Sequence, residues 1–188
     1  MNASVSGAGS FLRRGLSFFY TKIMASAREN ETLTAGQRAP DFRLENLQGG
    51  QTTLKELLPA GPVLLAFFKV SCPTCQFTMP FVERIYRGIA DGNTRIFAIS
   101  QDDARATREF QKEFGITMPM LLDSAGNGYP ASNAYGLASV PSLFLVERDG
   151  TISWSLVGFH KKDLEALGGK MGVNPFKPGD RVPEMKSG

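Results

Sequence analysis

Residues 63–75 read VLLAFFKVSCPTC, and this stretch decides the fold. The run from Val63 to Val70 is almost wholly apolar and has the length of a strand buried on both faces, as in the centre of a parallel sheet. It leads directly into Cys72-Pro73-Thr74-Cys75, which contains both cysteines of the 188-residue chain. Two thiols at this spacing, between a buried strand and the start of a helix, indicate the exchange of electrons with disulfides of other proteins.

A helix is predicted to begin at this dithiol. Pro73 suits the first turn of a helix, where its missing N–H is not needed. Pro80 lies inside the predicted helix and is expected to kink it, and Glu83 with Arg87 supplies an i,i+4 ion pair. The segment 91–93 (Asp-Gly-Asn) is expected to end the helix. Apolar residues recur every four positions, which is a helical period: Phe77, Phe81, Ile85 and Ile89.

Strand and helix patterns continue to alternate along the rest of the chain. Further strands are predicted over 42–45, 95–100, 119–123, 143–146 and 152–157, the last two joined by a turn at Asp149-Gly150. Helical segments are predicted over 53–57, 104–114, 133–137 and 161–167, with a polar loop over 124–132. Asp102 and Asp103 are expected to cap the helix that follows them, and Gly168-Gly169 to close the last one. This order predicts an α/β fold with a mixed central sheet and helices on both faces.

Composition and charge argue against several classes of function. The net charge is +3, and the basic residues are scattered rather than clustered with aromatic ones, so no nucleic-acid partner is expected. No apolar run approaches the ~20 residues that span a bilayer, and no integral membrane segment is expected. Zinc usually requires four ligands, whereas the chain has two cysteines and a single histidine, His160, far from them in sequence. No metal site is therefore expected.

Three regions are predicted along the chain. Residues 32–169 form the folded domain, and 170–188, rich in Gly, Pro and Lys, form a poorly packed tail. Residues 1–31 form a flexible extension or a targeting segment, because 1–28 lack Asp and Glu and 25–27 (Ala-Ser-Ala) fit a small-residue cleavage site. The apolar part of this segment is short and interrupted by Lys22, so a cytoplasmic protein is predicted, with a disordered extension or a true start at Met24. Export to the periplasm through residues 1–27 and import into an organelle are the alternatives.

Further motifs resemble those of a known family. Ala39-Pro40-Asp41-Phe42 lies near the start of the domain, LLDSAG and AYGL occupy 121–126 and 134–137, and Val140-Pro141-Ser142 precedes the predicted hairpin. Together with the order of strand, dithiol and helix, they resemble the thioredoxin-like fold and, within it, the redoxin (AhpC/TSA) superfamily, over residues 34–168. The TlpA/ResA-like thiol–disulfide oxidoreductases are the branch most similar to it. The resemblance implies a three-layer α/β/α sandwich.

The resemblance also implies roles for the two cysteines. Cys72 matches the nucleophilic cysteine of thioredoxin-like proteins, and Cys75 matches the cysteine that resolves the mixed disulfide. The physical argument agrees, because unpaired N–H groups and the dipole at a helix N-terminus stabilise a thiolate at the position of Cys72. Cys75 lies one turn further along the helix, close enough to attack a sulfur bonded to Cys72.

A substrate-binding surface is implied beside them. Pro141 matches a proline, normally cis, that lies opposite the dithiol in this family. The backbone just before it, at Val140, is where the chain of a substrate pairs. Pro73 and Thr74, between the two cysteines, are assigned with them to this surface.

The sequence departs from the family pattern at residues that tune the chemistry. Ala66 stands where thioredoxins have a buried Asp that assists proton transfer from the second cysteine, and Thr78 stands where some TlpA/ResA-like proteins have a Glu. The proton acceptor for Cys75 is therefore unassigned. Peroxiredoxins use a Pro-x-x-x-Thr-x-x-Cys site, and placing Cys75 at its end puts Phe68 and Cys72 where Pro and Thr belong. Efficient peroxidase chemistry is therefore not expected.

These observations predict a thiol–disulfide oxidoreductase that reduces or exchanges the disulfides of protein substrates. It is expected to need no bound cofactor, and a separate electron donor must regenerate the dithiol. Two alternatives remain open. One is a peroxiredoxin-like thiol peroxidase, and the other is a redox-silent binding module with a thioredoxin fold.

Overall fold

The computed structural model describes residues 31–89 and 94–188, and in this part of the chain strand β3, Val63–Phe68, lies in the interior of a seven-stranded sheet, next to its middle strand. Every residue of β3 is buried, as its apolar sequence predicts. On one side β3 pairs in parallel with β4, Arg95–Ser100, from Val63 opposite Arg95 to Phe68 opposite Ser100. On its other side it pairs antiparallel with β6, Ser142–Val146.

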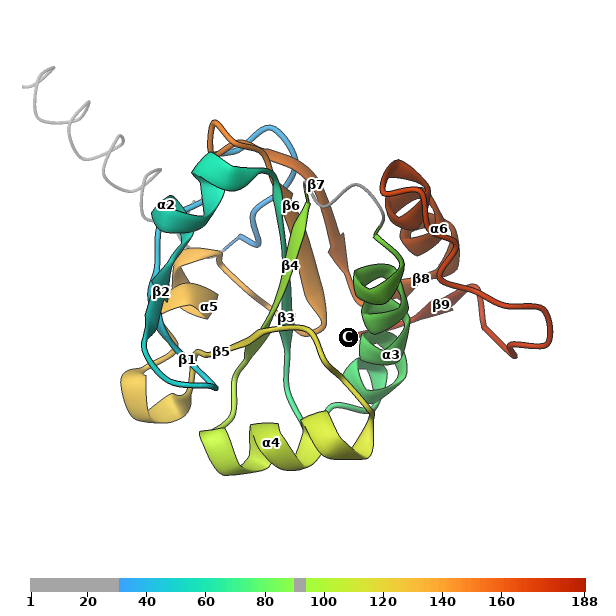
Figure 1. The fold of residues 1–188 in the computed structure, drawn as a ribbon, viewed down its shortest axis with the longest axis horizontal. Coiled ribbons are helices and arrows are strands. Elements are labelled where there is room, and N and C mark those ends of the chain that lie inside the picture. The colour runs from blue at the N-terminus through green and yellow to red at the C-terminus, as the bar shows by residue number, and fades with distance from the viewer. Residues whose placement is uncertain (1–30, 90–93) are drawn as a thin grey trace, which may run out of the picture. The chain divides into compact units, whose positions relative to one another are not determined.

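The sheet is mixed, as predicted, and its strands run in the order β2-β1-β5-β4-β3-β6-β7 (Figure 1). Parallel pairing holds β5, β4 and β3 together, and antiparallel hairpins form both edges. The remaining strands of this sheet are β1 (Arg43–Asn46), β2 (Gln51–Thr53), β5 (Met120–Leu122) and β7 (Ile152–Val157). A separate two-stranded sheet pairs β8 (Phe159–His160) with β9 (Met185–Lys186).

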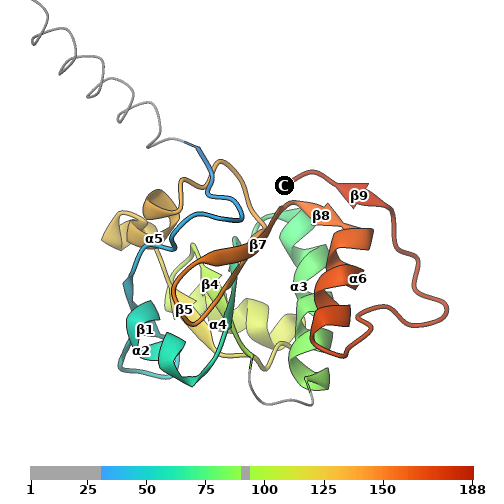
Figure 2. The ribbon, with the colours of Figure 1, turned by 90° about the horizontal axis from the view of Figure 1, so that it is seen from above.

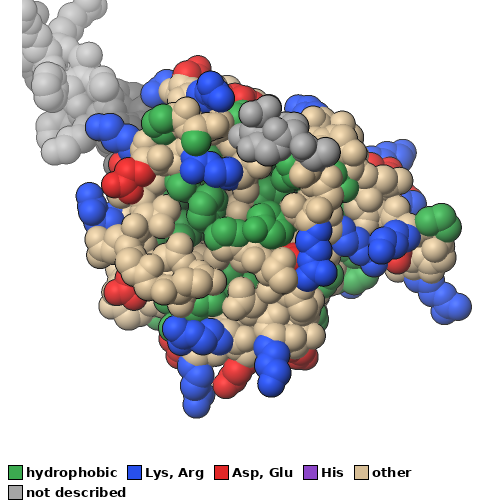
Figure 3. Space-filling model, viewed as in Figure 1, with side chains coloured by type: hydrophobic (Ala, Val, Ile, Leu, Met, Phe, Trp, Pro, Cys, Tyr) green, Lys and Arg blue, Asp and Glu red, His purple; other side chains and the backbone are tan. Residues whose placement is uncertain are grey.

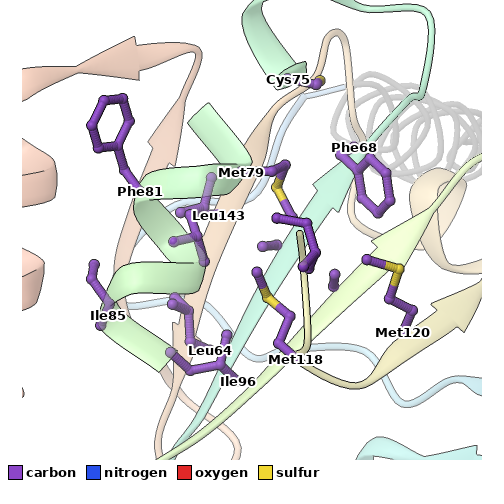
Figure 4. Packing of buried hydrophobic residues seen from close by; sticks show 14 of the residues in the cluster. Leu64, Phe68, Cys75, Met79, Phe81, Ile85, Ile96, Met118, Met120 and Leu143 are labelled. Atoms are coloured by element: carbon purple, nitrogen blue, oxygen red, sulfur yellow. The ribbon is translucent and has the colours of Figure 1, made fainter. Parts of the chain in front are cut away.

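The side chains of β3 point alternately to the two faces of the sheet and so enter two separate cores. Helices cover each of these cores. Leu64, Ala66 and Phe68 enter one core, and Val63, Leu65 and Phe67 enter the other. The first core is closed by α3 (Pro73–Gly88), α4 (Ala104–Glu113) and α6 (Lys161–Lys170), and Figure 4 shows its packing. The second is closed by α2 (Leu54–Leu57) and α5 (Pro130–Ala134). The fold is the α/β/α sandwich of thioredoxin-like proteins.

The helix that carries the dithiol is α3, and it begins at Pro73 as predicted. Pro80 lies inside it, and its C-terminal cap is Ile89. The predicted stop at 91–93 lies outside the described residues. Single 3-10 turns follow α2 and β5, at Leu58–Ala60 and Ala125–Asn127.

Two helices differ from the prediction in where they begin or end. Helix α5 begins at Pro130, inside the predicted polar loop, because the buried carboxylate of Asp123 accepts hydrogen bonds from the backbone N–H groups of Ala131 (2.9 Å) and Ser132 (2.7 Å). Helix α6 continues through the glycine pair to Lys170. Gly168 allows a close approach of chain, since a β-carbon there would lie 2.4 Å from the Val173 carbonyl oxygen.

The C-terminal tail contacts the domain at several residues, although most of its residues are exposed. The ring of Phe176 lies 4.9 Å from that of Phe81 on α3, measured between centroids. Asp180 pairs with Arg84 at 2.5 Å, and the tail ends beside α3 after forming β9 (Figure 2). The sequence composition gave no sign of these contacts because each joins the tail to residues nearly 100 positions away. Residues 1–30 lie outside the described residues, so the expected extension or targeting segment is untested.

The surface carries charged side chains of both signs. Figure 3 shows them around a hollow in which hydrophobic side chains gather. Within residues 31–89 and 94–188, no helix combines the length and the apolar character that crossing a membrane requires.

Candidate active site

Cys72 lies at the N-terminus of α3, at the end of a short loop that follows β3. The loop is fixed by three hydrogen bonds. The N–H of Cys72 donates to the carbonyl of Lys69 (3.1 Å), and the N–H of Val70 donates to Oδ2 of Asp102 (2.8 Å). Gln76, on α3, donates from Nε2 to the carbonyl of Val70 (2.8 Å). The position of the first thiol is therefore set by β3, by α3 and by Asp102, the second residue after β4.

The two cysteines differ sharply in exposure. Both are free thiols, with Cys72 partly exposed and Cys75 fully buried. The backbone N–H of Cys75 donates to the sulfur of Cys72 at 3.2 Å, which caps the helix and would stabilise a Cys72 thiolate. Burial, followed by the hydrogen bond to Cys72, raises the pKa of the Cys75 thiol well above its ordinary value. Figure 4 shows Cys75 at one end of the apolar core, with Met79 one turn further along the helix.

Val140 and Pro141 lie next to the dithiol, although they are about 70 residues away in sequence. The peptide bond between them is cis. The thiol of Cys72 donates to the carbonyl oxygen of Val140, with 3.4 Å between sulfur and oxygen. The carbonyl of Pro141 in turn accepts a hydrogen bond from the N–H of Gly158 (2.8 Å). The structure thus brings together the residues that the sequence assigned to the site.

Pro73 and Thr74 complete the first turn of α3. Pro73 occupies the first helical position. The hydroxyl of Thr74 donates to the carbonyl of Ser187 at 2.6 Å, so Thr74 contacts the last residues of the chain. This contact was not predicted, because nothing local in the sequence connects residues 74 and 187.

The positions that lack the family's carboxylates are filled by groups that cannot accept a proton from Cys75. Ala66 is buried in β3, and the hydroxyl of Thr78 donates to the carbonyl of Thr74 (2.7 Å). Asp102 supplies a carboxylate from a different element, and its negative charge contributes to the raised pKa of Cys75. Asp103 alone caps α4, accepting from the N–H of Ala106 at 2.8 Å. A helix needs only one capping residue here, and the sequence has two successive aspartates. The extra aspartate was therefore the one sign in the sequence that Asp102 has another role.

His160 is the last residue of β8. It directly precedes α6, and its Nδ1 is 3.7 Å from a carboxylate oxygen of Asp163. Among the described residues, no three His, Cys, Asp or Glu side chains are grouped to hold a metal ion.

Known proteins resemble this chain in sequence and in fold. The chain is 30% identical to the thiol-disulfide oxidoreductase ResA of Halalkalibacterium halodurans over 135 residues, which cover 71% of this chain and 73% of that protein. The thioredoxin domain of a thiol-disulfide oxidoreductase from Bacteroides vulgatus superposes with a TM-score of 0.65 at 22% identity, covering 76% of this chain and 100% of that one. A putative thiol:disulfide interchange protein DsbE from Chlorobium tepidum gives a TM-score of 0.65 at 24% identity, with 74% and 96% covered. The two structural likenesses establish the thioredoxin fold.

The relatives correct the predicted location. ResA and DsbE proteins are extracytoplasmic, which points to an exported protein. The cytoplasmic location inferred from the short, Lys22-interrupted apolar segment is therefore wrong. Such a segment is a weak pattern, and its length alone did not distinguish a leader from an extension.

The family match covers the whole site. Residues 35–155 match the AhpC/TSA family, which is more than half of the chain and includes the dithiol and the Val140–Pro141 bond. The ResA likeness agrees with this match and narrows it toward thiol–disulfide oxidoreductases. The chain therefore belongs to the AhpC/TSA family.

Proposed function

We propose that this thiol–disulfide oxidoreductase acts through Cys72 as the attacking thiolate and Cys75 as the resolving thiol. One observation carries the assignment. Cys72 is partly exposed at the helix N-terminus and accepts a hydrogen bond from the N–H of Cys75, whose own thiol is fully buried. An attacking thiol must reach its substrate, whereas a resolving thiol needs to reach only the sulfur beside it.

The reaction then proceeds in two exchanges. The Cys72 thiolate attacks one sulfur of a target disulfide, whose S–S bond breaks, and the departing thiolate takes up a proton. Cys75 then loses its proton and attacks Cys72, which releases the second target thiol and leaves a Cys72–Cys75 disulfide. Two electrons pass to the target, and a separate dithiol donor must return them. Because burial raises the pKa of Cys75, this thiol stays protonated while Cys72 makes the first attack.

The proposed substrate-binding surface consists of Val140, Pro141, Pro73 and Thr74. The carbonyl of Val140 already lies within hydrogen-bond distance of the Cys72 sulfur. A substrate chain pairing with the backbone of Val140 would therefore present its disulfide directly to the nucleophile. Pro73 and the hydroxyl of Thr74 flank the same position on the helix.

A peroxidase fits the structure less well. In the alignment that gives Cys75 the peroxidatic position, the reacting sulfur is fully buried, and Phe68 beside it is fully buried as well. Hydrogen peroxide would have to reach a sulfur that has no exposed surface. The oxidoreductase assignment requires access only to Cys72.

Trapping experiments test these roles. Cys75→Ser should accumulate mixed disulfides with insulin, whose disulfides are the target, or with native partners. These adducts on Cys72 are detected by mass spectrometry. Cys72→Ser is the matched control, since the buried Cys75 thiol should form few adducts. Adducts that form on Cys72→Ser and not on Cys75→Ser would reverse the assignment. If neither variant forms adducts and the wild-type protein does not cycle against glutathione buffers, the dithiol has no redox role.

A further inference from the structure

Residues 185–188, the last four of the sequence, lie across the side of the dithiol. Met185 and Lys186 form β9, which pairs antiparallel with β8, with Phe159 opposite Lys186. The next carbonyl, of Ser187, accepts the 2.6 Å hydrogen bond from Thr74, which lies between the two cysteines. Figures 1 and 2 both place the end of the chain beside the first turn of α3.

The final residue reaches the backbone that faces the nucleophile. A β-carbon added to Gly188 would lie 2.8 Å from the carbonyl oxygen of Val140 and 3.0 Å from the hydroxyl of Ser139. The same Val140 carbonyl accepts the hydrogen bond from the Cys72 thiol. The end of the chain and the attacking sulfur therefore share one neighbour.

Gly158 makes room for this segment. Its φ is +76°, and a β-carbon there would lie 2.8 Å from the carbonyl oxygen of Lys186 and 3.2 Å from the nitrogen of Gly188. The segment thus passes close to the backbone of both Gly158 and Val140. These are contacts that any extended polypeptide can make, because they involve main-chain atoms rather than particular side chains.

The tail is anchored upstream through side chains, whereas its last residues are held by the short strand β9, the bond from Thr74 and the ammonium of Lys186, which lies 5.3 Å from the ring centroid of Phe77. Phe176 packs on Phe81, and Asp180 pairs with Arg84. Beyond them, β9 has only two residues, and Met185 is 60% exposed. A two-residue strand with little buried apolar surface opens easily. The anchor meanwhile keeps the segment near the site at a high effective concentration.

Building on the proposed function, we propose that residues 185–188 occupy the strip on which the extended chain of a substrate protein binds. The strip consists of the Thr74 hydroxyl, the edge of β8 and the carbonyl of Val140. A substrate chain displaces the segment, adds to β8 as a strand, and offers a carbonyl to Thr74. The position taken by Gly188 favours a small substrate residue, because a β-carbon there approaches Val140 closely.

A chain that ends at Glu184 tests the proposal, since it keeps Phe176 and Asp180. With insulin as the protein disulfide, its kcat/KM should exceed that of the full chain several-fold, mainly through a lower KM. Lys186→Pro in the full chain, which disrupts β9 without deletion, should act in the same direction. Equal kcat/KM values for the full chain and both variants would overturn the proposal.

Thr74→Val gives a sharper readout, because it removes the hydrogen bond that Thr74 donates either to the tail or, as proposed, to the substrate. In the shortened chain, loss of one hydrogen bond to the substrate should lower kcat/KM about fivefold. In the full chain the tail loses the same bond, so the two effects should nearly cancel. An equal loss of kcat/KM in both chains would show that the tail and the substrate do not compete for Thr74, which would overturn the proposal. Failure of both chains to reduce insulin at all would instead remove the proposed function on which this inference rests.

Discussion

Glu83 should contribute far more to stability than its i,i+4 spacing from Arg87 suggests. The sequence predicts a pair worth about 0.2–0.5 kcal/mol, the usual value on a helix surface. In the structure Glu83 is only 4% exposed. It accepts hydrogen bonds from Nε of Arg87 (2.6 Å), from the backbone N–H of Met118 (3.0 Å) and from the hydroxyl of Thr117. It therefore ties α3, which carries the dithiol, to the segment that leads into β5.

The cost of Glu83→Ala follows from these partners. The buried N–H of Met118 loses its acceptor, which costs about 1–3 kcal/mol, and the bond from Thr117 adds about 1 kcal/mol. Arg87 adds little, because its side chain is 57% exposed and still donates to the carbonyl of Gly115 at 2.8 Å. The expected loss is about 2–4 kcal/mol. For a chain of this size it corresponds to a fall in Tm of about 5–15 °C.

Glu109→Ala is the matched control. Glu109 is also an i,i+4 partner of an arginine, Arg105, but the pair is 4.0 Å apart and Glu109 is 71% exposed. Its loss should change the free energy of unfolding by less than about 0.5 kcal/mol. Urea unfolding of the reduced proteins, followed by circular dichroism, measures both variants. A loss below 1 kcal/mol for Glu83→Ala, or one equal to that of Glu109→Ala, would refute the argument from burial.

Further predictions concern three titrating groups. Asp102→Asn removes a negative charge that helps to raise the pKa of Cys75, so the pH profile for decay of the mixed disulfide should shift to lower pH in single-turnover experiments. The hydrogen bond from Arg84 holds the pKa of Asp180 below its ordinary 3.8. This pair therefore stabilises the fold above about pH 4, and the difference in unfolding free energy between wild type and Asp180→Asn should vanish as the pH falls through the lowered pKa. Burial raises the pKa of Tyr135 above its ordinary 10, so in a spectrophotometric titration this phenol should ionise above pH 10. Tyr135→Phe should cost about 0.5–1.5 kcal/mol, because the Tyr135 hydroxyl no longer donates to the carbonyl of Pro40 (3.2 Å).

The centre of the fold was predictable because its signals are local. An apolar run followed by a dithiol and Pro73 specifies both a buried strand and a helix start, and the structure places β3 and α3 there. The pairing of Val140-Pro141 with Cys72 came from the family resemblance. Spacing alone could not have placed the Cys72 sulfur 3.4 Å from the carbonyl oxygen of a residue 68 positions away.

The parts that were missed depend on contacts between distant residues. The composition of the tail, rich in Gly and Pro, favours disorder, and only the approach of Phe176 to Phe81 and of Asp180 to Arg84 reverses that expectation. Asp102 looked like a second helix cap, since the sequence cannot show that the N–H of Val70 points toward it. For the tail and for Asp102 alike, the local sequence preference was identified correctly, but contacts with distant residues determine the structure.

The position of Gly188 has a practical consequence for handling the protein. An affinity tag fused after this residue would be held beside Val140 and Thr74, because the preceding residues already lie there. A protein captured on a resin through such a tag would turn its dithiol toward the matrix. Rates measured on a tagged protein would then report the tag as well as the enzyme. Kinetic comparisons therefore require a tag at another position, or one removed by a protease before assay.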